Sequence, residues 1–201
     1  MRPNKANIAF MHGPHDLRIE EVEIPALKPD QVLIKLGACG ICGSDVECFE
    51  GLSDEGRYDI APYTPGHEFA GKIVEVGSAV TSMKVGDKAV GDCVLPCYEC
   101  DNCKDGKMPS ACLNMREVGF RPDSPGGMGE YMILEERFTH VIPDDWSYEM
   151  GAWVETFNVG YWGVWGNNCN PDASDDCVII GAGPIGITAA ILCRGAVAKV
   201  R

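Results

Sequence analysis

Short alternations of apolar and polar residues fill the first ninety positions of the chain. The clearest runs are 32–36 and 73–76, and turn residues at 13–14 and 28–30 separate such runs. Residues that alternate in this way turn one face of a strand toward a core. The pattern predicts all-β packing in a partly closed barrel, with strands at 8–10, 17–23, 32–36, 71–76 and 88–90.

The pattern changes in the last third of the chain. A strand is expected at 130–134, and mixed helical spacing predicts a helix over 149–165. A polar stretch then leads to the apolar run 178–180, which is typical of a buried parallel strand. A glycine-rich turn and a helix at 187–193 follow it. We therefore expect a mainly β domain over 1–165 and the beginning of an α/β domain over 166–201.

Composition narrows the classes of function. Lys and Arg number 17 against 30 Asp and Glu, which gives a net charge of −13, and so acidic a surface disfavours nucleic acid as a partner. The uncharged stretch 177–193 is shorter than the roughly 20 residues of a membrane span, and glycines interrupt it, so no membrane partner is expected. Because the N-terminus carries no secretory signal pattern, we expect a cytoplasmic protein with reduced thiols.

Four of the eleven cysteines follow a spacing that suits a metal ion. They lie in the segment 93–112, which is rich in Cys, Asp, Lys and Gly and has almost no apolar residues with which to build a core. The alternatives are buried thiols, disulfides or an iron–sulfur cluster, whose bacterial pattern has a closer fourth Cys followed by Pro. A closed structural zinc site is the interpretation we favour, with Cys93 as a spare ligand and these four residues as the main ones: Cys97, Cys100, Cys103 and Cys112.

A second set of candidate ligands is spread along the chain. It consists of Cys42 in CGICGSD, His67 and Glu68 in GHEFAG, and Glu155 in VETF. Each residue alone is more often a core thiol, a hydrogen-bonded histidine or a surface carboxylate. Together they offer sulfur, nitrogen and oxygen with one position left open, which is the arrangement of a catalytic zinc.

Five motifs together carry a family resemblance. Positions 66–80 spell GHExxGxxxxxGxxV, accompanied by CGICGSD at 39–45, the four-cysteine segment, GGMGEYM at 126–132 and GAGPIG at 181–186. In this order the chain resembles the zinc-containing medium-chain alcohol dehydrogenases from near its start to its end. The resemblance implies a chaperonin-10-like (GroES-like) β-barrel catalytic domain followed by the beginning of a Rossmann domain, that is, the N-terminal portion of such an enzyme.

The resemblance also implies ligands for a catalytic zinc ion. Cys42 and His67 become ligands, and either Glu68 or Glu155 supplies the oxygen. In these enzymes the ion acts as a Lewis acid on the substrate hydroxyl while hydride passes to a nicotinamide ring. One catalytic and one structural zinc are therefore expected.

Three residues of the segment after Cys42 match further positions of the family. Ser44 matches the hydroxyl of a proton relay, and Asp45 matches a residue that accepts a hydrogen bond from the zinc-bound histidine. Glu47 stands where many relatives have a histidine as the last proton acceptor. Either Glu47 takes the proton or the relay ends differently.

The glycine-rich turn indicates a dinucleotide cofactor. It follows an apolar run and precedes a helical pattern, which is the context that a pyrophosphate-binding GxGxxG turn requires. The acidic residue that would contact the ribose falls at or beyond position 201, so NAD and NADP both stay open. The residues expected to bind the cofactor are Gly181, Gly183, Pro184, Ile185 and Gly186.

The substrate is inferred from the resemblance alone. CGICGSDV together with VETFNVG resembles the sorbitol and polyol dehydrogenase branch, so a sugar alcohol or vicinal diol is the first choice, and threonine or a secondary alcohol the second. A homo-oligomer is implied for the full-length protein. The isolated 201 residues are expected to hold zinc without turning over, and the alternative from another class is a non-catalytic zinc-stabilised β-barrel module.

Overall fold

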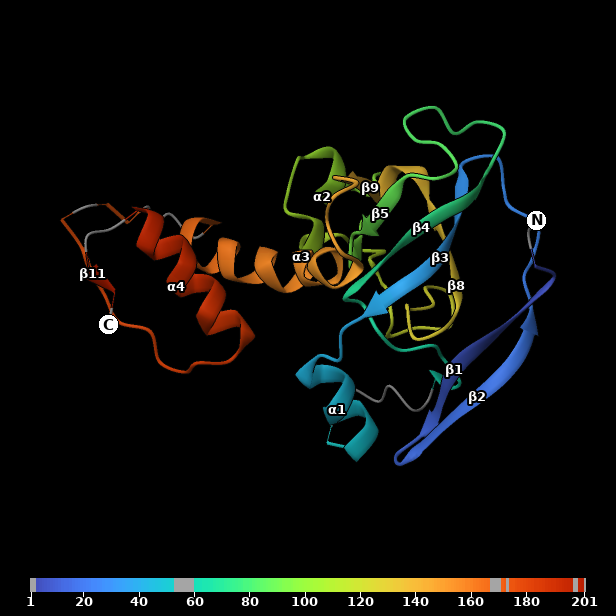
Figure 1. The fold of residues 1–201 in the computed structure, drawn as a ribbon, viewed down its shortest axis with the longest axis horizontal. Coiled ribbons are helices and arrows are strands. Elements are labelled where there is room, and N and C mark those ends of the chain that lie inside the picture. The colour runs from blue at the N-terminus through green and yellow to red at the C-terminus, as the bar shows by residue number, and fades with distance from the viewer. Residues whose placement is uncertain (1–2, 53–59, 167–170, 173, 197–198, 201) are drawn as a thin grey trace. The chain divides into compact units, whose positions relative to one another are not determined.

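The computed structural model describes residues 3–52, 60–166, 171–172, 174–196 and 199–200 (Figure 1). The chain divides into two compact units, residues 1–152 and 153–201.

A five-stranded antiparallel sheet organises the first unit. Its strand order is β8-β3-β4-β5-β9, and β3 and β4 lie near its middle in Figure 1. The strands of this sheet confirm those that the sequence predicts at 32–36, 71–76, 88–90 and 130–134. Their bounds are β3 Gln31–Cys39, β4 Phe69–Val76, β5 Lys88–Gly91, β8 Tyr131–Glu135 and β9 Thr139–Ile142.

A hairpin formed by β1 (Lys5–Gly13) and β2 (Asp16–Glu23) precedes the sheet. Isolated bridges join β1 to Tyr63 and to Gly129. The tip of the hairpin contacts the first helix, because the N–H of His15 donates to the carbonyl oxygen of Phe49 at 2.8 Å.

The core of the first unit is built mainly on the sheet. Val32, Ile34 and Ile73 are completely buried in one cluster. Leu33, on the opposite face of β3, is completely buried as well, so both faces of this strand are covered at that point. The other buried members of this cluster are Phe69, Ala89, Leu95, Val118, Met132, Leu134 and Phe138.

Short elements cover the ends of this sheet. The helix α1 (Gly43–Glu50) begins four residues after β3 ends. The cysteine segment contains hardly any regular structure, as its sequence predicts. Its elements are β6 Val94–Leu95, α2 Asp101–Lys104 and the 3-10 turn Pro109–Ala111, and β7 Arg116–Glu117 follows and pairs with β6. Another 3-10 turn, Glu136–Phe138, lies between β8 and β9.

The second unit is mainly helical in its described residues. The helix α3 (Tyr148–Tyr161), which begins in the first unit, continues as a short π-helix at Trp162–Gly166, close to the predicted 149–165. The helix α4 (Pro184–Ala196) follows the glycine-rich turn. Two short parallel strands, β10 (Asp176–Cys177) and β11 (Lys199–Val200), pair with each other.

The expected buried strand at 178–180 is wrong in its position and its burial. The strand ends at Cys177, and the side chains that follow it are open to solvent, with Val178 at 73% and Ile180 at 98% exposure. Within the described residues β10 pairs only with β11 and over two residues, so no layer covers the apolar run. An apolar run becomes a buried strand only where neighbouring strands and helices cover it.

Candidate functional site

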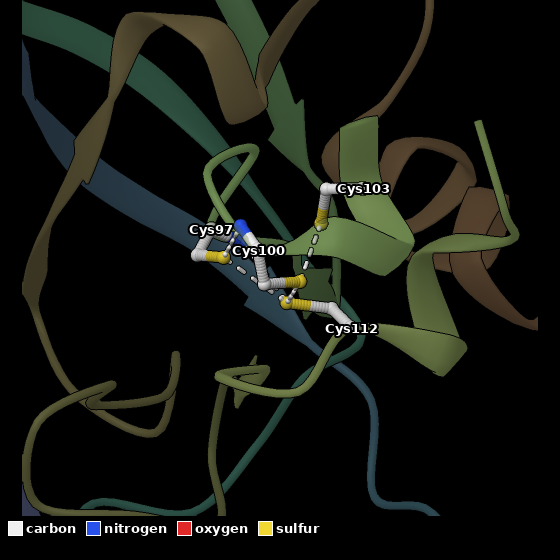
Figure 2. Close-up of side chains that lie close together, drawn as sticks. All are labelled: Cys97, Cys100, Cys103 and Cys112. Atoms are coloured by element: carbon white, nitrogen blue, oxygen red, sulfur yellow. Dashed lines mark hydrogen bonds between the residues drawn. The ribbon is translucent and has the colours of Figure 1, made fainter. Parts of the chain in front are cut away.

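The four cysteines of the segment 93–112 converge on one point (Figure 2). Their sulfur atoms all lie within 4.8 Å of one another. The Sγ atoms of Cys100 and Cys103 are 3.5 Å apart, those of Cys100 and Cys112 are 3.9 Å apart, and those of Cys97 and Cys112 are 3.5 Å apart. Because tetrahedral sulfurs at a Zn–S distance of about 2.3 Å are about 3.8 Å apart, this geometry fits a zinc ion and is far too open for a disulfide.

Local backbone groups prepare one of these thiols to bind as a thiolate. The N–H groups of Glu99 and Cys100 both point at the Sγ of Cys97, at 3.4 Å, and they lower the pKa of that thiol to about 6. Removal from water raises the pKa of Cys103 to about 12. A bound ion would act in the same direction as the amides at Cys97 and would overcome the raised pKa at Cys103, since a coordinated thiol is deprotonated. Cys93 lies outside this four-residue cluster.

The loop between Cys103 and Cys112 is held by Asn102, a residue that the sequence pattern does not indicate. Asn102 Nδ2 donates to the carbonyl oxygen of Ala111 at 2.7 Å, and Asn102 Oδ1 accepts from Lys107 Nζ at 2.7 Å. Asn102 therefore joins the two ends of the loop that delivers the last cysteine.

Tyr98 packs the cysteine segment against the 3-10 turn Glu136–Phe138. Its ring stacks on Phe138 at a centroid distance of 6.1 Å, and the Arg137 guanidinium lies 5.5 Å from the Tyr98 ring. Phe138 is completely buried. This stack therefore connects the polar segment to the hydrophobic core.

A second cluster brings together Cys42, His67 and Glu68. One ligand atom from each residue lies within 4.8 Å of the other two. Cys42 lies at the N-cap of α1, and His67 and Glu68 immediately precede β4. Three protein ligands of sulfur, nitrogen and oxygen type leave a fourth position for water or substrate, as in a catalytic zinc site.

The histidine of this cluster fits a metal ligand. His67 is 5% exposed, and its Nδ1 is buried without a hydrogen-bond partner among the described residues. Its ring lies beside Phe120 at a centroid distance of 4.9 Å. A buried polar nitrogen is costly unless something binds it, so a cluster that supplies two further donors suits a cation.

The turn before His67 depends on a glycine. Gly66 has φ +95°, and a Cβ built on it would lie 2.7 Å from the Sγ of Cys39 and 2.8 Å from the side chain of Met128. Both the backbone conformation and the available space therefore require glycine at this position.

Asp45 differs from its expected contact. The sequence resemblance predicts that its carboxylate accepts a hydrogen bond from His67, yet the oxygens accept from backbone amides: Cys42 N–H at 2.9 Å and Gly66 N–H at 3.3 Å. Asp45 is 5% exposed. Its place in the first turn of α1 lets one oxygen reach the N-cap amide, and the other reaches the turn before His67.

The remaining predicted site residues lie on helices. Ser44 is half-buried and Glu47 is exposed, both on α1, whereas Glu155 is half-buried on α3 in the second unit. The structure thus brings together three of the four spread-out ligand candidates, Cys42, His67 and Glu68, within the first unit.

A nearby thiol responds to the charge of this cluster. Cys39 ends β3, and burial followed by the negative charges of Asp45 and Glu68 raises the pKa of its thiol to about 12. Cys39 is therefore held as a neutral thiol beside the candidate ligands, unlike Cys97.

The glycine-rich turn forms the rim of a cavity of about 730 Å³ in the second unit. Gly181 has φ +104°, and a Cβ on Gly186 would lie 2.1 Å from the carbonyl oxygen of Gly181. Gly183 has open space around it, which suits close approach of a ligand to the backbone. Gly183, Pro184 and Ile185 line the cavity together with these two glycines.

The comparisons with known proteins agree with this architecture. A family model described as the alcohol dehydrogenase GroES-like domain matches residues 28–144. Since the match covers more than half of the sequence, the chain belongs to the alcohol dehydrogenase GroES-like domain family. The predicted fold class, a GroES-like domain followed by the beginning of an α/β domain, is thereby confirmed.

Named relatives act on polyols or bind a nicotinamide cofactor. The chain is 35% identical to the erythritol/L-threitol dehydrogenase of Mycolicibacterium smegmatis, over 92% of this chain and 53% of that protein. It is 36% identical to the sorbitol dehydrogenase of Bombyx mori, over 91% and 51%. An alcohol dehydrogenase from Escherichia coli solved with NADH has a TM-score of 0.83 and 30% identity, over 96% and 54%.

The chain spans about half the length of the curated relatives it matches. Among the described residues, none of the helices has both the length and the apolar character needed to cross a membrane.

Proposed function

We propose that this chain contributes the zinc-binding catalytic domain of an oxidoreductase that transfers hydride between a sugar alcohol or vicinal diol and NAD or NADP. The observation that carries the proposal is the cluster of sulfur, nitrogen and oxygen donors within 4.8 Å. Family membership and polyol-oxidising relatives support the reaction class.

The residues of the cluster have distinct roles in this proposal. Cys42, His67 and Glu68 hold the ion, and Glu155 is the alternative source of oxygen. A bound zinc would supply Lewis acidity toward the substrate hydroxyl. Ser44 passes the hydroxyl proton outward, and the exposed carboxylate of Glu47, about one turn further along α1, accepts it.

The same proposal assigns roles to the other parts of the chain. Cys97, Cys100, Cys103 and Cys112 hold a structural zinc in the lobe 93–112, within a catalytic domain that we propose for 1–165. The segment 166–201 begins the dinucleotide domain, in which the turn at 181–186 receives the pyrophosphate. For the complete protein we propose a homo-oligomer in the cytoplasm.

Zinc content tests the proposal directly. Protein purified without chelator is expected to hold two zinc ions per chain by elemental analysis, and Cys42→Ala is expected to hold one. Cys103→Ser is the matched control, because it should lose the other ion. A wild type that holds only one ion, unchanged in Cys42→Ala, would instead support a non-catalytic zinc-stabilised β-barrel module.

The substrate class needs the complete protein. Oxidation of sorbitol, a vicinal diol, threonine and a simple secondary alcohol is followed by the formation of reduced nicotinamide with NAD and with NADP. Preference for sorbitol or the diol supports the proposal, and preference for threonine would contradict the substrate assignment. We expect no sustained turnover by residues 1–201 alone.

A further inference from the structure

Gly40 lies directly against Glu68 where two strands of the sheet end. The last pair of the β3–β4 ladder is Cys39 with Phe69. One residue further along, the N–H of Gly40 donates to the carbonyl oxygen of Glu68 at 2.6 Å. The antiparallel register therefore sets the backbone of Gly40 beside the residue that follows His67.

The Glu68 side chain occupies the space that a side chain at Gly40 would need. A Cβ built on Gly40 would lie 2.2 Å from Oε2 of Glu68, 3.0 Å from its Cβ and 3.2 Å from its Cδ. The contact with Oε2 is too close for both atoms to stay in place, and the contacts with Cβ and Cδ are already tight. The side chain of Glu68 would have to swing away.

The backbone of Gly40 does not itself require glycine. Its φ lies outside the left-handed region in which Gly51, Gly66 and Gly181 are found. Any residue can adopt such a conformation, so the space taken by Glu68 is the feature that excludes a larger residue here.

We propose that Gly40 is a positioning residue for the candidate metal centre. Its missing side chain leaves room for the Glu68 carboxylate to lie over the backbone, beside Cys42 and His67. The inference rests on the proposed function, because it assigns a role at the same site. It also assigns the oxygen ligand to Glu68, since the site is built to hold that carboxylate.

Alanine substitutions at two glycines of one motif test the inference. Gly40→Ala should displace the Glu68 carboxylate and weaken zinc binding at the Cys42–His67–Glu68 cluster, here called the second zinc site. The expected loss of affinity is about 10- to 100-fold, the usual cost of disturbing a residue that supports a ligand. Gly43→Ala is the matched control, because a Cβ there would meet nothing within 4 Å. We expect Gly43→Ala to bind zinc as the wild type does.

The measurements separate a local effect from a fold defect. Zinc affinity is obtained by competition with a chelator, and far-UV circular dichroism reports the fold. The absorption of protein loaded with cobalt reports whether an oxygen ligand has been lost at the second ion. Gly40→Ala should keep the wild-type dichroism and the zinc of the four-cysteine lobe while its cobalt spectrum changes.

A double-mutant cycle shows whether Gly40 acts through Glu68. In a Glu68→Ala background the carboxylate is absent, so adding Gly40→Ala should lower the zinc affinity of the second site no further. Unchanged zinc affinity in Gly40→Ala, or an equal weakening in both backgrounds, would overturn the inference while leaving the proposed function intact. A wild type that holds only one zinc, retained in Cys42→Ala, would instead overturn the proposed function and this inference with it.

Discussion

The carboxylate of Asp45 accepts a hydrogen bond from the backbone N–H of Gly66 at 3.3 Å, across 21 residues of sequence. Its other oxygen accepts from the N–H of Cys42 at 2.9 Å. One buried side chain therefore links the backbone of one candidate ligand to the turn that presents His67. This link fixes two ligands relative to each other without touching either ligand atom.

Asp45→Asn should weaken both the fold and the metal centre. The substituted amide would place a donor against one of two backbone donors, and a buried unsatisfied N–H costs about 1–3 kcal/mol. We expect a corresponding loss in the free energy of unfolding by urea. We also expect the zinc affinity of the Cys42–His67–Glu68 cluster to fall by about 10-fold or more.

An exposed aspartate provides the control for this prediction. Asp145→Asn changes the same charge at the surface, and it should leave stability and zinc affinity as in the wild type. If Asp45→Asn bound both zinc ions with wild-type affinity, Asp45 would not position the ligands.

Asn102→Ala should loosen the four-cysteine lobe. It removes the hydrogen bond to Ala111 and leaves the loop before Cys112 free to move. We expect the structural zinc to leave on the order of 10-fold faster in the presence of a chelating dye. Lys104→Ala, an exposed change in the same helix α2, should leave the rate unaltered, and equal rates for both variants would contradict the prediction.

Local patterns in the sequence predict the strands and the four-cysteine lobe well. Alternation of period two is a property of neighbouring residues, and the lobe gathers its ligands within 16 positions. The second cluster is different, because Cys42 and His67 come together only through the pairing of β3 with β4. Only a family resemblance made that juxtaposition visible beforehand.

A sequence does not show which side chains bind or contact backbone groups. The resemblance assigned Asp45 to the histidine ring, whereas two amides take up its oxygens. In the same way, nothing in the sequence shows that Gly40 faces the carboxylate of Glu68. The apolar run at 178–180 was misplaced for a related reason, because its burial depends on a sheet that the run does not encode by itself.

Gly186→Ala should disturb the start of α4. The added methyl group would overlap the carbonyl oxygen of Gly181, and such overpacking costs about 1–3 kcal/mol. We expect faster hydrogen exchange of the α4 amides. Gly195→Ala, in the same helix with open space around it, should slow exchange because alanine favours a helix by about 0.5–1 kcal/mol. Equal exchange in the two variants would show that the turn tolerates a side chain.

Glu136 should make stability depend on pH. Its Oε1 accepts from the N–H groups of Ser82 and Thr81 and from the Ser82 hydroxyl, at 2.6, 2.7 and 2.8 Å. These donors, the Ser82 amide foremost, hold the pKa of the carboxyl below its usual range. A lowered folded-state pKa stabilises the fold above the unfolded-state pKa of about 4.3, and this contribution is lost as pH falls through the lower folded-state value.

Glu136→Gln should therefore be less stable than the wild type at pH 7, and the difference should shrink as the solution is acidified below about pH 4. Urea unfolding of both proteins across this range measures the difference directly. Glu23→Gln changes an exposed carboxylate on β2 and should show no such pH-dependent difference. A difference between Glu136→Gln and wild type that stayed constant with pH would mean that the three donors do not bind the ionised carboxylate preferentially.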